Sequence, residues 1–166
     1  MIVYSRNQVD LGVTIDWEHQ LLHEGKVHFA SVKFAPMGSE TKYLTLIPQE
    51  KNIHLKNMSF SMESGSLDVE LLEGAELNSN GVSVPCINLN RIFSGTTGNL
   101  SVFHSSNIVS YGNSIYSSSI YDGKQASNRD DDIEEFLLDK NKTYLINLTH
   151  VGNSTGLRAS ITWYIT

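Results

Sequence analysis

A strict alternation of apolar and polar residues is the clearest pattern along the chain. It runs through Val9, Leu11, Val13, Ile15 and Trp17 near the start, and through Ala159, Ile161, Trp163 and Ile165 near the end. Two shorter sets are Tyr144, Ile146 and Leu148, and Leu67, Val69 and Leu71. Alternation with a period of two turns one side of a strand toward a core and the other toward water. The pattern therefore predicts a β-strand in each of these segments.

Further segments are strand-like but alternate less regularly. They are Val27–Phe34, Tyr43–Ile47, Ile53–Met62, Val84–Leu89, Leu100–His104 and Ile115–Tyr121. Turns such as Asn80-Gly81 and Asp122-Gly123 separate the segments, and many short strands punctuated in this way are typical of a sandwich or a barrel. We predict an all-β, antiparallel β-sandwich with little helix. Its inward-facing residues are predicted to be Leu11, Val13, Ile15, Tyr144, Ile146, Leu148, Ile161 and Trp163.

Helix signals are few. Asp16–Glu24 can form one or two helical turns, with Asp16 as N-cap and Gly25 as terminator. Asp131–Leu138 is a second candidate helix, because Asp131 followed by Glu134 resembles a capping box. Ser105–Ser119 is rich in serine, and we expect a long loop followed by a strand there.

Composition and charge narrow the function. The 166 residues fit a single domain spanning 1–166. The net charge is −6 and the basic residues are scattered singly, which argues against a nucleic-acid partner. No apolar run reaches the length of a membrane span, and Met1–Asp10 lacks the apolar core of a signal peptide. Cys86 is the only cysteine, so folding in a reducing cytoplasm is the simple interpretation.

Few residues suggest chemistry. His19 and His23 are spaced like zinc ligands on a helix, but Gln20 stands where a zincin has glutamate. The acidic stretch Asp130–Asp132 lacks the glycine of a calcium loop, so a solvated loop is the favoured interpretation. Tyr111, Tyr116 and Tyr121 either line a sheet face, which is favoured, or form a sugar-stacking platform. We therefore expect no enzyme, and no catalytic, cofactor-binding or metal-binding residues.

Three segments together carry a family resemblance. They are HQLLHEGKVHF from His19 to Phe29, VELLEG to NLNR between Val69 and Arg91, and NKTYLINLTHVGNS followed by ASITWYI at the end. In this order they resemble the jelly-roll cement or decoration proteins of tailed-phage capsids. The resemblance implies a jelly-roll fold and a structural role, with no catalytic residues to carry over. It implies a protein that is made in the host bacterial cytoplasm and binds the major capsid protein on the capsid exterior. The alternative is a carbohydrate-binding or host-recognition module on the virion surface.

The partner-binding residues are expected near the N-terminus. Ile2, Val3 and Tyr4 form an apolar terminus, so residues 1–24 could be a docking arm, or the terminus could simply add an edge strand. We also expect a homo-oligomer, with a trimer favoured over a dimer. Val27–Phe34 and Ile115–Tyr121 carry more apolar side chains than one core requires, unless both are central strands of one monomer.

Overall fold

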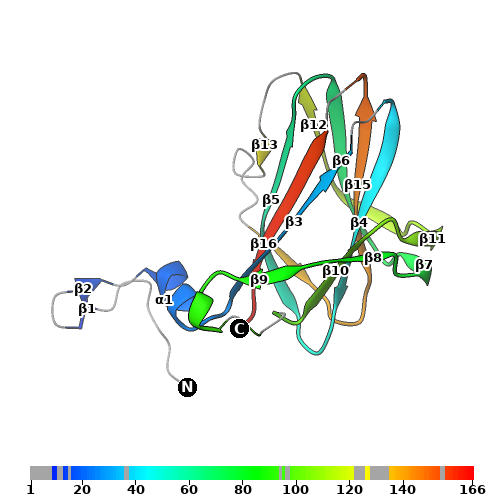
Figure 1. Ribbon diagram of the computed structural model, residues 1–166. Helices are drawn as coiled ribbons and strands as arrows, with labels where there is room; N and C mark the ends of the chain where they lie inside the picture. The colour runs from blue at the N-terminus through cyan, green and yellow to red at the C-terminus, as the bar shows by residue number, and fades with distance from the viewer. Residues whose placement is uncertain are drawn as a thin grey trace.

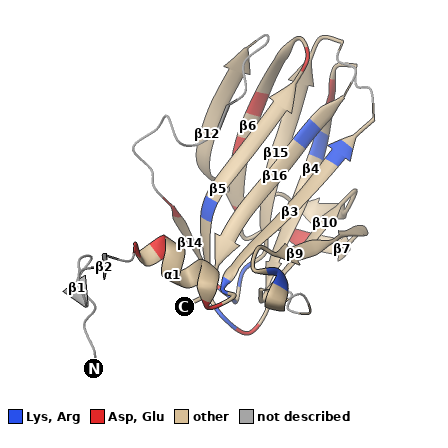
Figure 2. Cartoon of the chain, turned by 60° about the vertical axis from the view of Figure 1, so that its left-hand side comes forward, with Lys and Arg blue, Asp and Glu red and all other residues tan. Residues whose placement is uncertain are grey.

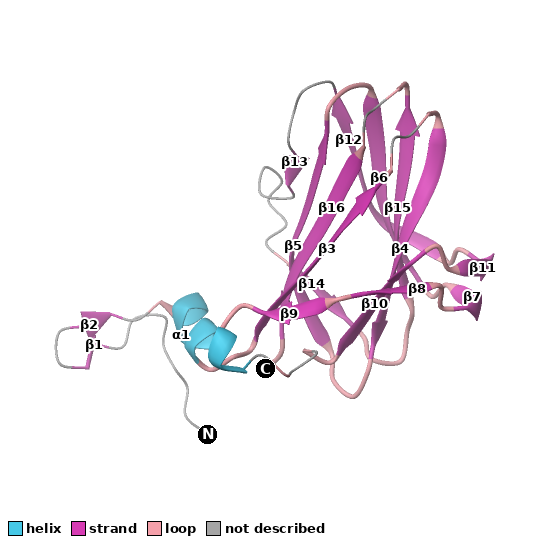
Figure 3. Ribbon diagram, viewed as in Figure 1, coloured by secondary structure: helices cyan, strands magenta, loops and turns pink. Residues whose placement is uncertain are grey.

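Two antiparallel β-sheets pack face to face in this computed structural model (Figure 1). One sheet has the strand order β12-β6-β15-β4-β10-β8, and the other has the order β13-β5-β16-β3-β9, with β14 also pairing with β5. Strands dominate the chain and α1 is a short helix at one end of the sandwich (Figure 3). The predicted all-β, antiparallel sandwich is therefore confirmed.

In chain order, the elements are β1 (Val9–Asp10), β2 (Val13–Thr14), α1 (Trp17–His23), β3 (Val27–Phe34), β4 (Glu40–Pro48), β5 (Ile53–Met62), β6 (Ser66–Glu73), β7 (Glu76–Ser79), β8 (Val82–Val84), β9 (Cys86–Asn88), the 3₁₀ turn η1 (Arg91–Phe93), β10 (Leu100–His104), β11 (Asn107–Ser110), β12 (Asn113–Tyr121), β13 (Ala126–Ser127), β14 (Phe136–Leu138), β15 (Tyr144–Val151) and β16 (Leu157–Tyr164). The structure describes residues 9–10, 13–14, 16–35, 38–93, 95, 98–121, 126–127, 135–153 and 156–166. Side chains are not described at 9–10, 13–14 and 126–127. The predictions for Ile2, Val3, Tyr4, Leu11, Val13, Ile15 and Asp130–Asp132 therefore fall outside the described part.

The strand pairing is that of a jelly roll. The first and last long strands, β3 and β16, pair antiparallel, and so do the next pair inward, β4 and β15. Inside these, β5 pairs with β13 and β14, and β6 pairs with β12. The chain is thus a nested series of antiparallel pairs that alternate between the two sheets, which is the wrapped topology of a jelly roll.

The predicted core residues lie between the two sheets. Tyr144, Ile146, Leu148, Ile161 and Trp163 are each at most 1% exposed, as the alternation predicted. The bounds of β3, β5 and β10 also coincide with the predicted segments. β3 is a central strand between β16 and β9, whereas β12 is an edge strand that pairs only with β6. Val27–Phe34 is therefore a central strand of one monomer, although Val27 and Phe29 on its outer face are only half-buried.

An excursion of 35 residues, 76–110, is inserted between β6 and β12. Its strands β8 and β10 extend one sheet beyond β4, while β9 extends the other sheet beyond β3. The predicted single strand Val84–Leu89 is therefore wrong, because β8 and β9 belong to different sheets. Pro85 lies at the break, and proline cannot donate a ladder hydrogen bond.

The strands β7 and β11 of the excursion form an arm that leaves the edge of the sandwich (Figure 1). Its Leu77 and Ile108 pack against a second small core of Leu72, Ala75 and Leu145. Leu145 is fully buried although it faces outward from its sheet, because the arm covers it. The prediction of a long loop within Ser105–Ser119 is therefore wrong for β11. This segment is a strand because it packs against residues that are distant in the sequence.

Two other sequence predictions are corrected. Val9–Trp17 is not one strand, because β1 pairs with β2 and Trp17 begins α1. Asp131–Leu138 is not a helix at its end, because Phe136–Leu138 is β14 and pairs with β5. Leu138 is fully buried there, so burial in the sheet outweighs the local capping signal.

The helix α1 lies where the sequence predicted it. Asp16 occupies the N-cap position with extended backbone but makes no side-chain capping hydrogen bond. Gly25 follows the C-cap with a φ of +67°, a conformation that glycine adopts without strain. An ion pair of 2.5 Å between Glu18 and Lys56 joins α1 to β5. Among the described residues, no helix combines the length and apolar character needed to cross a lipid bilayer.

Replacement of Trp163 by alanine should destabilise the protein by about 3–5 kcal/mol, because the side chain is fully buried and its removal leaves a cavity. The measurement is denaturant unfolding followed by far-UV circular dichroism. Trp17→Ala is the control, since Trp17 is 42% exposed and its loss should cost much less. Equal midpoints for the two variants would contradict the assignment of Trp163 to the core.

Candidate functional site

The histidines of α1 lie together. His19 and His23 share one face of the helix, and their Nε2 atoms are 2.9 Å apart at hydrogen-bond distance. A zinc site needs further protein ligands beyond such a pair. Within the described residues, no group of three or more histidine, cysteine, aspartate or glutamate side chains is arranged to hold a metal ion.

Cys86 is a half-buried thiol at the crossing between the sheets. Its Sγ lies 3.6 Å from the carbonyl oxygens of Val84 and Leu100, and it packs against the main core. Burial raises the pKa of the Cys86 thiol. A raised pKa lowers the thiolate fraction, so this cysteine is a poor nucleophile at neutral pH.

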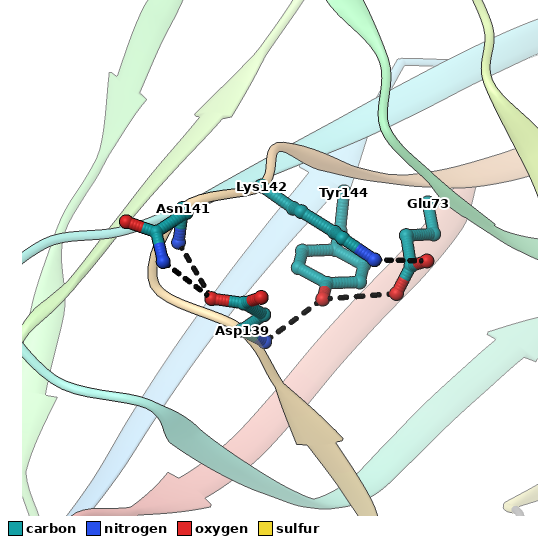
Figure 4. Close-up of polar contacts among 5 residues, drawn as sticks. All are labelled: Glu73, Asp139, Asn141, Lys142 and Tyr144. Carbon is teal, nitrogen blue, oxygen red and sulfur yellow. Dashed lines mark hydrogen bonds and ion pairs between the residues drawn. The ribbon is translucent and has the colours of Figure 1, made fainter.

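A cluster of titratable groups joins the β14–β15 turn to β6 (Figure 4). The Tyr144 hydroxyl donates to Glu73 Oε2 at 3.2 Å, and Lys142 Nζ donates to Glu73 Oε1 at 2.7 Å. Burial, with a contribution from the carboxylate of Glu73, raises the pKa of Tyr144 to about 12. The hydrogen bond from Lys142 holds the pKa of Glu73 below its usual range. The tyrosine therefore stays protonated and the carboxylate stays ionised. In these states their hydrogen bonds hold the β14–β15 turn against β6.

A second cluster joins β14 to β5 and β16. Glu135 accepts from the Tyr164 hydroxyl at 2.6 Å and from His54 Nδ1 at 2.9 Å, and the rings of His54 and Tyr164 stack at 4.5 Å. Burial alone would raise the pKa of Glu135, but these two hydrogen bonds outweigh it and lower the pKa. These hydrogen bonds hold the short strand β14 to its sheet.

The three tyrosines of the possible sugar platform are not brought together. Tyr116 packs toward the main core and contacts Phe136 edge to face, at 5.6 Å between ring centroids. Tyr111 lies two residues before β12 and Tyr121 is its last residue, and they are 49% and 66% exposed. Tyr111 instead contacts Tyr43, a residue that the sequence analysis did not single out.

An exposed apolar surface lies at the edge of the β3–β9 sheet, beside α1. It consists of Val27, Phe29, Ile87, Leu89, Ile92 and Phe93, and we call it the apolar corner. Ile92 is 88% exposed, and Ile87, Leu89 and Phe93 are each 41–43% exposed. Ile87 pairs with Phe29 across the two strands, so their side chains lie on the same outer face of the sheet.

Backbone and amide contacts fix the apolar corner in place. Asn90 caps the turn η1 by accepting from the backbone N–H of Ile92 at 3.1 Å, and its Nδ2 donates to the carbonyl oxygen of His23 at 3.0 Å. The ring of Phe93 lies so close to Gly25 that a Cβ there would be 2.5 Å from it. The corner is therefore anchored to the end of α1, and Gly25 is required both for its φ and for this approach.

A buried polar cluster supports the apolar corner from inside. His28 and Asn88 are cross-strand partners, 0% and 1% exposed, and Asn88 Nδ2 lies 3.2 Å from His28 Nε2 and 2.7 Å from the Gly25 carbonyl oxygen. His28 Nδ1 lies 3.1 Å from the carbonyl oxygen of Lys26. A carbonyl only accepts, so Nδ1 carries the hydrogen and Nε2 accepts from Asn88. These contacts fit the neutral imidazole.

Comparison with known proteins does not assign this chain to a family. No protein-family model matches the sequence, and neither a curated protein nor a solved structure shows a significant match. The apolar corner had no counterpart in the sequence analysis, where Ile87 and Leu89 were read as part of one strand. The signal that could have found it is Pro85, followed by four apolar residues within Ile87–Phe93.

Acidification should destabilise the protein through His28. Burial lowers the pKa of His28, and the hydrogen bond to Lys26 offsets this only in part. The unfolded chain then binds a proton near the ordinary histidine pKa of about 6.5 while the folded chain resists it. Stability is therefore fully present above that pH and is lost as the pH falls toward the lowered pKa of the folded state.

The measurement is the melting temperature between pH 7.5 and 5. His28→Gln removes the titrating ring, so its melting temperature should fall less over this range than that of the wild type. Trp17→Ala, an exposed change that removes no titrating group, is the control and should keep the wild-type dependence. A His28→Gln variant that loses as much stability as the wild type on acidification would refute the assignment.

Proposed function

We propose that this chain is a structural virion protein, a capsid cement or decoration protein that binds the outer surface of a phage head. The apolar corner carries the proposal, because exposed and clustered apolar side chains on a rigid support are typical of protein-binding surfaces. The sequence resemblance supplies the partner, which is the major capsid protein. The jelly-roll topology is compatible with this role and with many others, so the role rests on the surface and the resemblance.

A cement protein acts by adding contacts between neighbouring shell subunits. The two packed sheets provide a stiff body, with α1 at one end of it (Figure 2). The apolar corner is anchored to the end of α1 through Asn90. Burial of the corner against a capsid subunit would contribute roughly 25 cal/mol for each Å² of apolar surface removed from water. Contacts repeated over a whole shell act together, so a modest contribution from each copy suffices.

The N-terminal segment is the second part of the proposed contact. Residues 1–15 join the body through α1, and the last turn of α1 contacts the apolar corner through the His23 carbonyl oxygen and Asn90. A partner that covers the corner would thus lie beside the last turn of α1. We propose that Ile2, Val3 and Tyr4 extend the same contact, with 1–24 acting as the docking arm.

Binding to phage heads that lack this protein tests the proposed function. The wild-type protein should co-sediment with such heads and raise the temperature at which they break. Ile92→Asp places a charge at the most exposed residue of the apolar corner and should weaken binding about tenfold or more, since burial of an unpaired charge is costly. The folded state should be unaffected because Ile92 is 88% exposed.

Val109→Asp is the matched control. Val109 is 66% exposed on β11, outside the apolar corner, so its replacement should leave head binding unchanged. Loss of binding in both variants, or in neither, would show that the corner is not the contact surface. Failure of the wild-type protein to bind any such head would overturn the cement function itself.

We also propose that the protein self-associates as a trimer, matching the three-fold positions of a phage shell. Exposed apolar side chains on the edge strand β12, Ile115 at 43% and Tyr121 at 66%, support an association between copies. The molar mass measured by light scattering should approach three times the chain mass of 18.5 kDa as the protein concentration increases. A dimer would overturn the choice of symmetry, and a monomer both in solution and on the particle would overturn self-association.

A further inference from the structure

The outer face of the sheet β12-β6-β15-β4 carries two rows of polar side chains that cross all four strands. One row is Tyr43, Asn147, Glu70 and Ser117, and the next is Thr41, Thr149, Asp68 and Ser119. All of these side chains are partly or fully exposed. We call the two rows, together with Tyr111, the polar face. It lies on the opposite side of the sandwich from the outer face that carries the apolar corner.

The side chains of the polar face hold one another in place. Asn147 Nδ2 donates to Glu70 Oε2 at 2.9 Å, and Ser119 Oγ donates to Asp68 Oδ1 at 2.6 Å. The hydroxyls of Thr41 and Thr149 lie 3.2 Å apart. The hydrogen bonds that the structure describes use one of the two Asn147 amide N–H groups and one of the two Glu70 oxygens. A donor and an acceptor are thus left side by side, already oriented.

Two tyrosines border this polar pair. The Tyr43 hydroxyl lies 3.4 Å from that of Tyr111, and their rings are tilted by 41° with centroids 5.5 Å apart. Tyr111 leads from the arm into β12 and is 49% exposed, so an aromatic surface is presented beside the amide and the carboxylate. Burial, followed by the hydrogen bond with Tyr111, raises the pKa of Tyr43 to about 12. Its hydroxyl therefore remains protonated and can both donate and accept.

The β7–β11 arm limits the polar face on one side. The adjacent row of the same sheet face contains Leu145 and Leu72, which are 0% and 6% exposed because the arm covers them. Thr45, in that same row, is also fully buried and hydrogen-bonds to Ser106 at 2.7 Å. The open rows thus begin where the arm ends, and Tyr111 lies at that boundary.

We propose that the polar face binds a neutral oligosaccharide, with a sugar ring stacked on Tyr111 and its hydroxyls bonded to Asn147 and Glu70. A sugar combines an apolar C–H face with adjacent hydroxyls that each donate and accept, and an aromatic ring beside an amide and a carboxylate matches that combination. The carboxylates of Asp68 and Glu70 disfavour an anionic chain. This site is separate from the apolar corner, so the protein could bind a glycan while docked through the corner.

A glycan array of neutral and acidic oligosaccharides, followed by calorimetry with the best neutral ligand, tests the proposal. Tyr111→Ala removes the stacking ring and Asn147→Ala removes the amide, and each should weaken binding about tenfold or more. Tyr111→Phe keeps the ring and should retain most of the affinity. Circular dichroism and melting temperature establish that each variant is folded.

Leu137→Ala is the control, because Leu137 is 61% exposed on β14 of the other sheet and its loss should leave affinity unchanged. Head binding by Tyr111→Ala should equal that of the wild type, which separates this site from the proposed cement function. The proposal is overturned if no neutral oligosaccharide binds, if only acidic ones bind, or if Tyr111→Ala and Asn147→Ala bind as the wild type does. Loss of head binding in Tyr111→Ala would show a protein-docking face instead.

Discussion

The buried contact around Trp163 is the constraint on which the rest of the structure depends. Trp163 lies on the last strand, stacks on His28 of the first long strand at 5.8 Å, and donates through Nε1 to the carbonyl oxygen of Gly98 at 3.0 Å. Gly98 approaches His28 so closely that no side chain fits there. Asn88 completes the contact from the excursion. The first and last long strands, β3 and β16, therefore contact the inserted excursion and each other at one buried position.

The excursion decides which outer surfaces remain available. Its β9 and η1 create the apolar corner at the edge of one sheet, while its arm covers Leu72 and Leu145 on the other sheet and leaves the polar rows open. The same inserted segment thus borders both proposed binding surfaces. Because they lie on opposite sides of the sandwich, contact with a shell and contact with a ligand need not compete.

The titratable clusters show how short segments are held on this scaffold. Glu73 fixes the β14–β15 turn through Lys142 and Tyr144, and Glu135 fixes β14 through His54 and Tyr164. Each carboxylate has its pKa lowered by its hydrogen-bond donors. The charged partners Glu73, Lys142 and Glu135 are partly exposed, so their hydrogen bonds position strand ends, whereas Tyr144 itself also belongs to the core.

The sequence by itself determined the fold class, most long strands, the helix after Asp16 and the burial of Tyr144 and Trp163, because a period of two and glycine or N-cap signals are local properties. The tertiary structure alone decided the rest. Phe136–Leu138 became a strand by pairing with β5, and β11 gained its order from Leu72 and Leu145. Ile87 and Ile92 both belong to the apolar corner, and Tyr43 contacts Tyr111, which is 68 residues away in the sequence. Such contacts join residues far apart in the chain, so no local pattern records them.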